Sequence, residues 1–163
     1  TPPGSVPRVP PPEGPRPVPV PPPAPVAKPA LASELRQDPL IDRWYRSIQR
    51  RDVPGVMEAQ ASLQQREAES RVVLERIALE EPDARVRAFS VTALSRFKAP
   101  PAGAFFIGRL EDGDHGPRLA ALAALEKLGI RDGLSRVEQL ASGDPHEEVR
   151  AAALKTAATL RAK

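Results

Sequence analysis

The chain has 163 residues and a formal net charge of +3, and it contains no cysteine, two histidines and 21 prolines. Zero cysteines exclude a disulfide scaffold, a cysteine nucleophile and any thiolate metal site. No run of 18 apolar residues is present, so the sequence predicts no membrane-spanning segment. Two histidines leave little for acid–base chemistry, and we expect neither a cofactor nor a metal site.

Residues 1–30 form a separate segment, because they hold 14 of the 21 prolines. Proline fixes its own φ and restricts the residue before it, so the runs at 10–12 and 21–23 favour polyproline II. Such a segment has too little apolar bulk to form a core. We therefore expect a proline-rich extended tail over 1–30 and one folded domain over 31–163. The tail is either a free spacer or a strand that docks in an aromatic groove of a partner.

The start of the chain bears on its location. The first residue is Thr1 and not methionine, so we expect that a segment upstream was removed. A signal peptide or membrane anchor before a proline-rich spacer is a common arrangement in bacterial envelope proteins, and the lack of cysteine is consistent with it. These features favour the bacterial periplasm or cell envelope.

The positive charge is spread thinly. Arg8, Arg16 and Lys28 against Glu13 account for two of the three net charges, which leaves the folded part nearly balanced. A nucleic-acid-binding domain usually carries a concentrated stripe of lysine and arginine, so nucleic acid is an unlikely partner. The stretch 43–51 is the exception, since it interleaves aromatic residues with arginines as a nucleic-acid surface does.

From residue 31 onward the sequence predicts six or seven short helices and no strand, because good helix formers dominate and no strand-like alternation occurs. Asp38 and Pro39 mark a helix start, with Asp38 as the N-cap. A second helix is expected over about 54–66 and a third to about residue 81. Breaks follow at 99–101, 112–114, 129–133 and 143–145, where proline, glycine and aspartate cluster.

An internal repeat organises the second half of the chain. Three segments align without a gap, and each opens with an acid and ends in arginine six residues later. The acids are Glu81, Asp112 and Asp144, and the arginines are Arg87, Arg118 and Arg150. The arginines are 31 and 32 residues apart. The three segments therefore predict one structural unit repeated three times.

Each arginine is followed by the same pattern of residue sizes. The third and sixth residues after it are small, and the fourth, seventh and tenth are mostly apolar. Steps of 3, 4, 7 and 10 describe one buried face of a helix. The place thirteen residues before each arginine is also apolar, at Leu74, Phe105 and Val137, which predicts a first helix in every unit. The repeated unit is thus a pair of helices.

This pattern resembles the HEAT repeat, in particular the short variety found in the phycobilisome-lyase-like group. The second-helix signature of that family, an acid followed by Val-Arg and then by alanines at helical spacing, is matched best by 144–157. The segment 81–94 matches it well, and 112–125 follows with Pro117 in place of valine. The resemblance covers about 72–163. It implies an all-α fold, a short α-solenoid of HEAT-like helical hairpins.

The resemblance also implies a role for the acids and arginines of the repeat. In the HEAT family, an aspartate and an arginine of adjacent units pair in a ladder that joins the repeats. The residues at those places here are Glu81, Arg87, Asp112, Arg118, Asp144 and Arg150. The alternative is an anion site that the three arginines present to a partner.

The predicted architecture favours binding over chemistry. One helical hairpin cannot bury its own apolar face, so neighbours stack into a ribbon with an extended surface and no deep pocket. We expect a non-catalytic protein–protein interaction module, or an accessory or scaffold subunit of a larger assembly, held on a proline-rich stalk. Candidate partner-binding residues are Trp44, Tyr45, Arg46, Phe105 and Phe106, since exposed aromatic residues suit interface hot spots. Packing in the core is the alternative for the aromatic ones.

Other activities find less support. His115 and His146 lie in equivalent turns near aspartates, but the turns are one repeat apart and aspartate at a helix start is expected for capping. No glycine-rich phosphate loop and no Ser-His-Asp set is present, so the sequence does not predict an enzyme. Nucleic-acid binding through a basic helical surface, or a role as a bilin-lyase-like auxiliary subunit, remain the alternatives.

Overall fold

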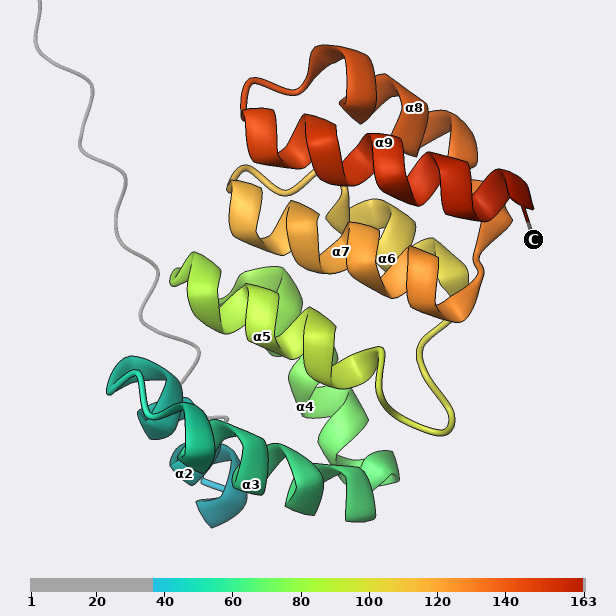
Figure 1. Ribbon diagram of the computed structural model, residues 1–163. Helices are drawn as coiled ribbons and strands as arrows, with labels where there is room; N and C mark the ends of the chain where they lie inside the picture. The colour runs from blue at the N-terminus through green and yellow to red at the C-terminus, as the bar shows by residue number, and fades with distance from the viewer. Residues whose placement is uncertain (1–36, 163) are drawn as a thin grey trace, which may run out of the picture.

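The computed structural model describes residues 37–162, and the predicted proline-rich tail lies outside this range. The described residues are all-helical, as the sequence predicts (Figure 1). They form eight α-helices and one 3-10 helix: α2 (Pro39–Gln49), α3 (Val53–Gln65), α4 (Glu67–Glu80), α5 (Ala84–Leu94), α6 (Gly103–Arg109), α7 (His115–Leu128), η1 (Arg131–Gly133), α8 (Leu134–Gly143) and α9 (Glu147–Ala162). None of these helices is long and apolar enough to cross a bilayer.

The ends of the helices follow from local capping. Asp38 caps α2 as predicted, because its carboxylate accepts a hydrogen bond of 2.8 Å from the backbone N–H of Leu40. Asp52 and Asp83 cap α3 and α5 in the same way. Helix α7 stops at Gly129, whose φ of 67° places it in the left-handed region that glycine adopts without strain. The breaks therefore fall where the aspartates and glycines predict them.

The helices form two layers. Helices α5, α7 and α9 run side by side in the same direction at the front of Figure 1, and α4, α6 and α8 lie behind them. Each front helix packs on the helix that precedes it in sequence and on the neighbouring front helix. Helices α2 and α3 lie at one end of this arrangement and α8 and α9 at the other. Three helix pairs thus follow one another: α4 with α5, α6 with α7, and α8 with α9.

The core runs through all the helix pairs and uses the small residues of the repeat. The third residue after each ladder arginine is fully buried in all three units, as is the sixth to within a few per cent. These small residues are Ser90, Ala121 and Ala153, and Ala93, Ala124 and Thr156. Because a small side chain lets two helix backbones approach closely, these positions set the distance between neighbouring front helices.

Three details differ from the sequence-based expectation. Residues 37–162 contain eight α-helices where six or seven were expected, and α6, with seven residues, is the shortest of them. Leu154, at an apolar position of the predicted buried face, is 62% exposed. In the middle unit the fully buried aromatic residue is Phe106, whereas Phe105 is half-buried. The predicted equivalence with Leu74 and Val137, both fully buried, is therefore shifted by one residue, because adjacent residues of a helix cannot face the same side.

Candidate functional site

The three arginines of the repeat close the turns that precede their own helices. In each unit the guanidinium Nη1 donates to the backbone carbonyl of the acid six residues earlier, over 2.7 Å for Arg87, 2.8 Å for Arg118 and 2.8 Å for Arg150. A buried carbonyl at a helix end needs a partner. The same atom thus satisfies the same carbonyl three times, which makes the turns structurally equivalent.

The remaining guanidinium nitrogens reach the acid of the following unit. Arg87 donates through Nε and Nη2 to the two carboxylate oxygens of Asp112, at 3.0 and 2.8 Å. Arg118 donates through Nη2 to Oδ1 of Asp144 over 3.1 Å, and its Nε lies 2.8 Å from Oδ2 without making a hydrogen bond. The two-pronged pair of Arg87 fixes orientation as well as distance. Each such pair therefore joins one unit to the next in a defined register.

The charge state of these acids follows from their surroundings. Burial raises the pKa of Asp144, but hydrogen bonds from the backbone N–H of His146 and from Arg118 outweigh it, so the pKa lies below its ordinary value. The pKa of Asp112 is lowered in the same way, against its own burial, by Arg87 and the backbone N–H of Asp114. Both carboxylates are therefore charged at neutral pH and paired with a cation.

The junction between α2 and the first of the three units is built differently. Glu81 is buried, and its Oε1 accepts a hydrogen bond of 3.3 Å from the hydroxyl of Tyr45 on α2. Gln49, one turn further along α2, donates to Asp83 over 2.9 Å. Tyr45, a candidate for partner contact, thus lies half-buried within the molecule. Neutral donors from α2 occupy the side of this turn where the later units have an arginine.

The other candidates for partner contact lie in different surroundings. Trp44 and Phe106 are fully buried. For both residues the structure thus shows packing in the core, the alternative to partner contact. Phe105 is half-buried, with its ring edge-on to Phe106 and the guanidinium of Arg109 5.9 Å from its centre. Arg46 is exposed and pairs with Asp42 on the same helix. The five residues therefore do not form one continuous surface.

The two histidines come together in the structure. The rings of His115 and His146 stack with their centres 4.7 Å apart, and Nδ1 of His146 lies 3.2 Å from Nη2 of Arg118. The nearby Asp144 is already engaged by that arginine. No group of three or more histidine and acidic side chains suited to hold a metal occurs within residues 37–162. The stacked rings therefore extend the contact between two neighbouring turns.

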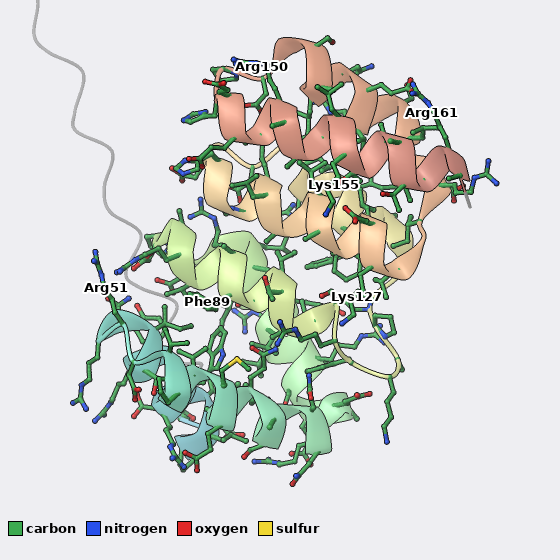
Figure 2. All side chains as sticks on the ribbon, in the orientation of Figure 1. Arg51, Phe89, Lys127, Arg150, Lys155 and Arg161 are labelled. Atoms are coloured by element: carbon green, nitrogen blue, oxygen red, sulfur yellow. The ribbon has the colours of Figure 1, made fainter. Side chains whose placement is uncertain are left out.

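The front layer presents a long exposed surface, here called the α5–α7–α9 face. It consists of the second, fifth and ninth residues after each ladder arginine, all exposed or half-buried. These residues are Phe89 and Thr92 on α5 with Arg96 just after it, Ala120, Ala123 and Lys127 on α7, and Ala152, Lys155 and Thr159 on α9. Figure 2 shows Phe89, Lys127 and Lys155 on this side. Small side chains and cations dominate the face.

Positive charge gathers on the α5–α7–α9 face. Burial and the neighbouring charge of Arg96 both lower the pKa of Lys127, so two cations lie close together here. Lys155 pairs with Glu126 at 3.3 Å. An open hollow of about 290 Å³ lies between α7 and α9. It is lined by Ala123, Glu126 and Lys127 of α7 and by Lys155 and Thr159 of α9. The face can therefore accept a side chain that carries negative charge.

Several of these residues were not singled out from the sequence. Asp114 adds a second carboxylate to Arg87 at 2.7 Å, and the hydrogen bond from Gln49 to Asp83 joins helices far apart in the chain. The α5–α7–α9 face, by contrast, has a signal in the sequence. Its members occupy the second, fifth and ninth positions after each arginine, which are not part of the predicted buried face. The alignment of the three segments therefore already defines the α5–α7–α9 face.

Comparisons with known proteins add no family to this description. No family model, no curated protein and no solved structure matches the chain. The geometry of the site therefore carries the functional argument alone.

Proposed function

We propose that the described helices form a short HEAT-like α-solenoid, and that the chain is a non-catalytic protein-binding module or accessory subunit that holds its partner on the α5–α7–α9 face. The observation that supports this most directly is the repeated arginine geometry. Each arginine closes its own turn at 2.7–2.8 Å, and Arg87 and Arg118 also grip the next unit's carboxylate. Such a regular stack leaves a long surface open along its second helices.

The chemistry of the face supports a protein partner that carries acidic residues. Its small residues let a segment of backbone approach the helices closely, and Arg96, Lys127 and Lys155 offer positive charge along its length. Phe89, at one end, is the large apolar side chain of the face and is 37% exposed. An aromatic anchor beside complementary charge is the usual composition of an interface.

A site-specific photo-cross-linking experiment tests the proposal. Benzoylphenylalanine is placed at Ala123, in the middle of the face, and separately at Val72, which is exposed on α4 in the other layer. The full chain is expressed in its organism of origin and irradiated. We expect a cross-linked protein from position 123 and none from position 72. Reversing the charge by Lys127→Glu together with Lys155→Glu should remove the cross-link, because both cations border the hollow next to Ala123.

Equal cross-linking from both positions, or an Ala123 cross-link that survives the double charge reversal, would contradict a specific interface on this face. The same cations make nucleic acid the second candidate. Fluorescence anisotropy with a labelled DNA duplex at about 50 mM salt, where phosphate contacts are strong, decides it. Binding that the double charge reversal abolishes would favour nucleic acid, and no binding would remove that candidate.

A further inference from the structure

One side of each front helix is covered in α5 and α7 but exposed in α9. In α5 and α7 the first, fourth and eighth residues after the ladder arginine are buried or half-buried, and each of these helices packs against the next front helix. These residues are Ala88 and Val91 on α5 with Ser95 at its C-cap, and Leu119, Leu122 and Glu126 on α7. In α9 the same positions are all exposed. They are Ala151, Leu154 and Ala158, and Leu154 is 62% exposed.

Arg150, the ladder arginine on this edge, also makes fewer contacts than Arg87 and Arg118. Arg150 donates through Nη1 to the carbonyls of Asp144 and Pro145, over 2.8 and 3.2 Å, as Arg87 does in its own turn. Arg87 and Arg118 use their other nitrogens to hold a carboxylate. Arg150 has no carboxylate within ion-pair distance among residues 37–162. Its guanidinium is nevertheless oriented by the same turn.

We propose that the outer edge of α9, formed by Arg150, Ala151, Leu154 and Ala158, binds an α-helix of another polypeptide that carries an aspartate or glutamate just before its first turn. The carboxylate takes the place at Arg150 that Asp144 takes at Arg118, and the helix covers Leu154 as α9 covers Leu122. Charge complementarity supports this occupant, because an oriented guanidinium without an acid lies beside an uncovered apolar stripe. Figure 2 places Arg150 near the start of α9, at the edge of the molecule away from α7.

A second copy of this chain fits the edge less well. In a symmetric pairing of α9 with itself about Leu154, Arg150 lies opposite Ala158 and meets no acid. Moving the two-fold axis close to Val149 brings Glu148 towards Arg150, but then Leu154 remains uncovered. A symmetric contact therefore satisfies the arginine or the apolar stripe and not both. A helix with its own acid satisfies both at once.

The test supplies such a helix from the chain's own sequence. A copy of residues 132–163 is fused directly after Lys163, so that the copied aspartate follows Arg150 by 26 residues, the separation between Arg118 and Asp144. Urea unfolding is then measured for the natural and the fused chain. We expect the fused chain to unfold at a higher urea concentration and as one unit. Arg150→Gln should lower the midpoint of the fused chain far more than that of the natural chain.

A double-mutant cycle identifies the contact. Arg150→Gln and the exchange of the copied aspartate for asparagine should be coupled by about tenfold in the unfolding equilibrium constant, as expected for directly interacting charges. Leu154→Glu should destabilise the fused chain and leave the natural chain unchanged. Val72→Glu is the matched control, because Val72 is also 62% exposed but lies on α4; it should not distinguish the two chains. An uncoupled cycle, or a copied segment that unfolds separately, overturns the proposal.

Sedimentation equilibrium of the natural chain over a wide concentration range tests whether a second copy of the chain binds this edge instead. A monomer supports the proposal, whereas a dimer that Leu154→Glu dissociates assigns the edge to a second copy and overturns it. The inference does not rest on the α5–α7–α9 face, since none of its residues is substituted in these variants. Failure at the edge and failure at the face are therefore distinguishable.

Discussion

At the level of single residues, the guanidinium groups of Arg118 and Arg150 make different sets of contacts. Both satisfy the carbonyl of their own turn, but Arg118 alone also neutralises a buried carboxylate, that of Asp144. Truncating Arg118 leaves that charge buried and unpaired, whereas truncating Arg150 removes two hydrogen bonds at the edge. The two positions thus form a natural pair for measuring what the inter-unit contact contributes.

Arg118→Ala is expected to destabilise the protein by about 3 kcal/mol, the cost typical of leaving one member of a buried ion pair without its partner. Arg150→Ala is expected to cost about 1 kcal/mol, the net value of ordinary hydrogen bonds. Urea unfolding followed by circular dichroism gives both free energies. Equal losses at the two positions would show that the carboxylate contact contributes nothing beyond closing the turn.

The carboxylate of Asp144 should also make stability depend on pH. Because its pKa is lower in the folded than in the unfolded state, the unfolded chain binds the proton more readily between the two values. The stabilisation is therefore fully present above the unfolded pKa of about 3.9 and is lost as the pH falls through the folded pKa. Asp144→Asn should be less stable than the parent at pH 7 and should decline less steeply below pH 4. Urea midpoints measured over a pH series check this, and parallel profiles would contradict it.

At the level of the helix, the small residues of the repeat have the most specific consequence. Ala121 on α7 is fully buried, whereas Ala123, two residues later, is exposed on the α5–α7–α9 face. Ala121→Leu should destabilise by about 1–3 kcal/mol through overpacking, because a close-packed core has no room for three further carbon atoms. Ala123→Leu, the control on the same helix, should change stability by less than about 0.5 kcal/mol. A neutral Ala121→Leu would show that α7 does not approach its neighbours closely there.

Helices and their buried faces were accessible from the sequence because they depend on local rules. Aspartate and glycine marked the helix ends, and the aligned segments placed Ser90, Ala121 and Ala153 on one buried face. The choice between Phe105 and Phe106 was not accessible, since α6 has only seven residues and its rotation is set by the helices around it. The contact of Tyr45 with Glu81 was also hidden, because α2 does not carry the repeat and this acid is bound by a tyrosine, whereas Asp112 and Asp144 are bound by arginines.

At the level of the whole molecule, the buried residues of the described range form one connected cluster that extends from Ile41 in α2 to Ala157 in α9. Removing residues 1–30 should therefore leave the helical content and the melting temperature of the isolated protein nearly unchanged. Circular dichroism of the full and shortened chains measures both. A large drop in melting temperature would show that the proline-rich segment packs against this cluster.

The two contacts that Arg87 and Arg118 each make also limit how the chain can change in length. A residue inserted between Asp112 and Arg118 would move one guanidinium away from its own carbonyl and from the neighbouring carboxylate together. The interval of six residues between the acid and the arginine of each turn therefore has to be kept. An engineer who wishes to lengthen, shorten or exchange these units has to cut and rejoin the chain outside the three turns.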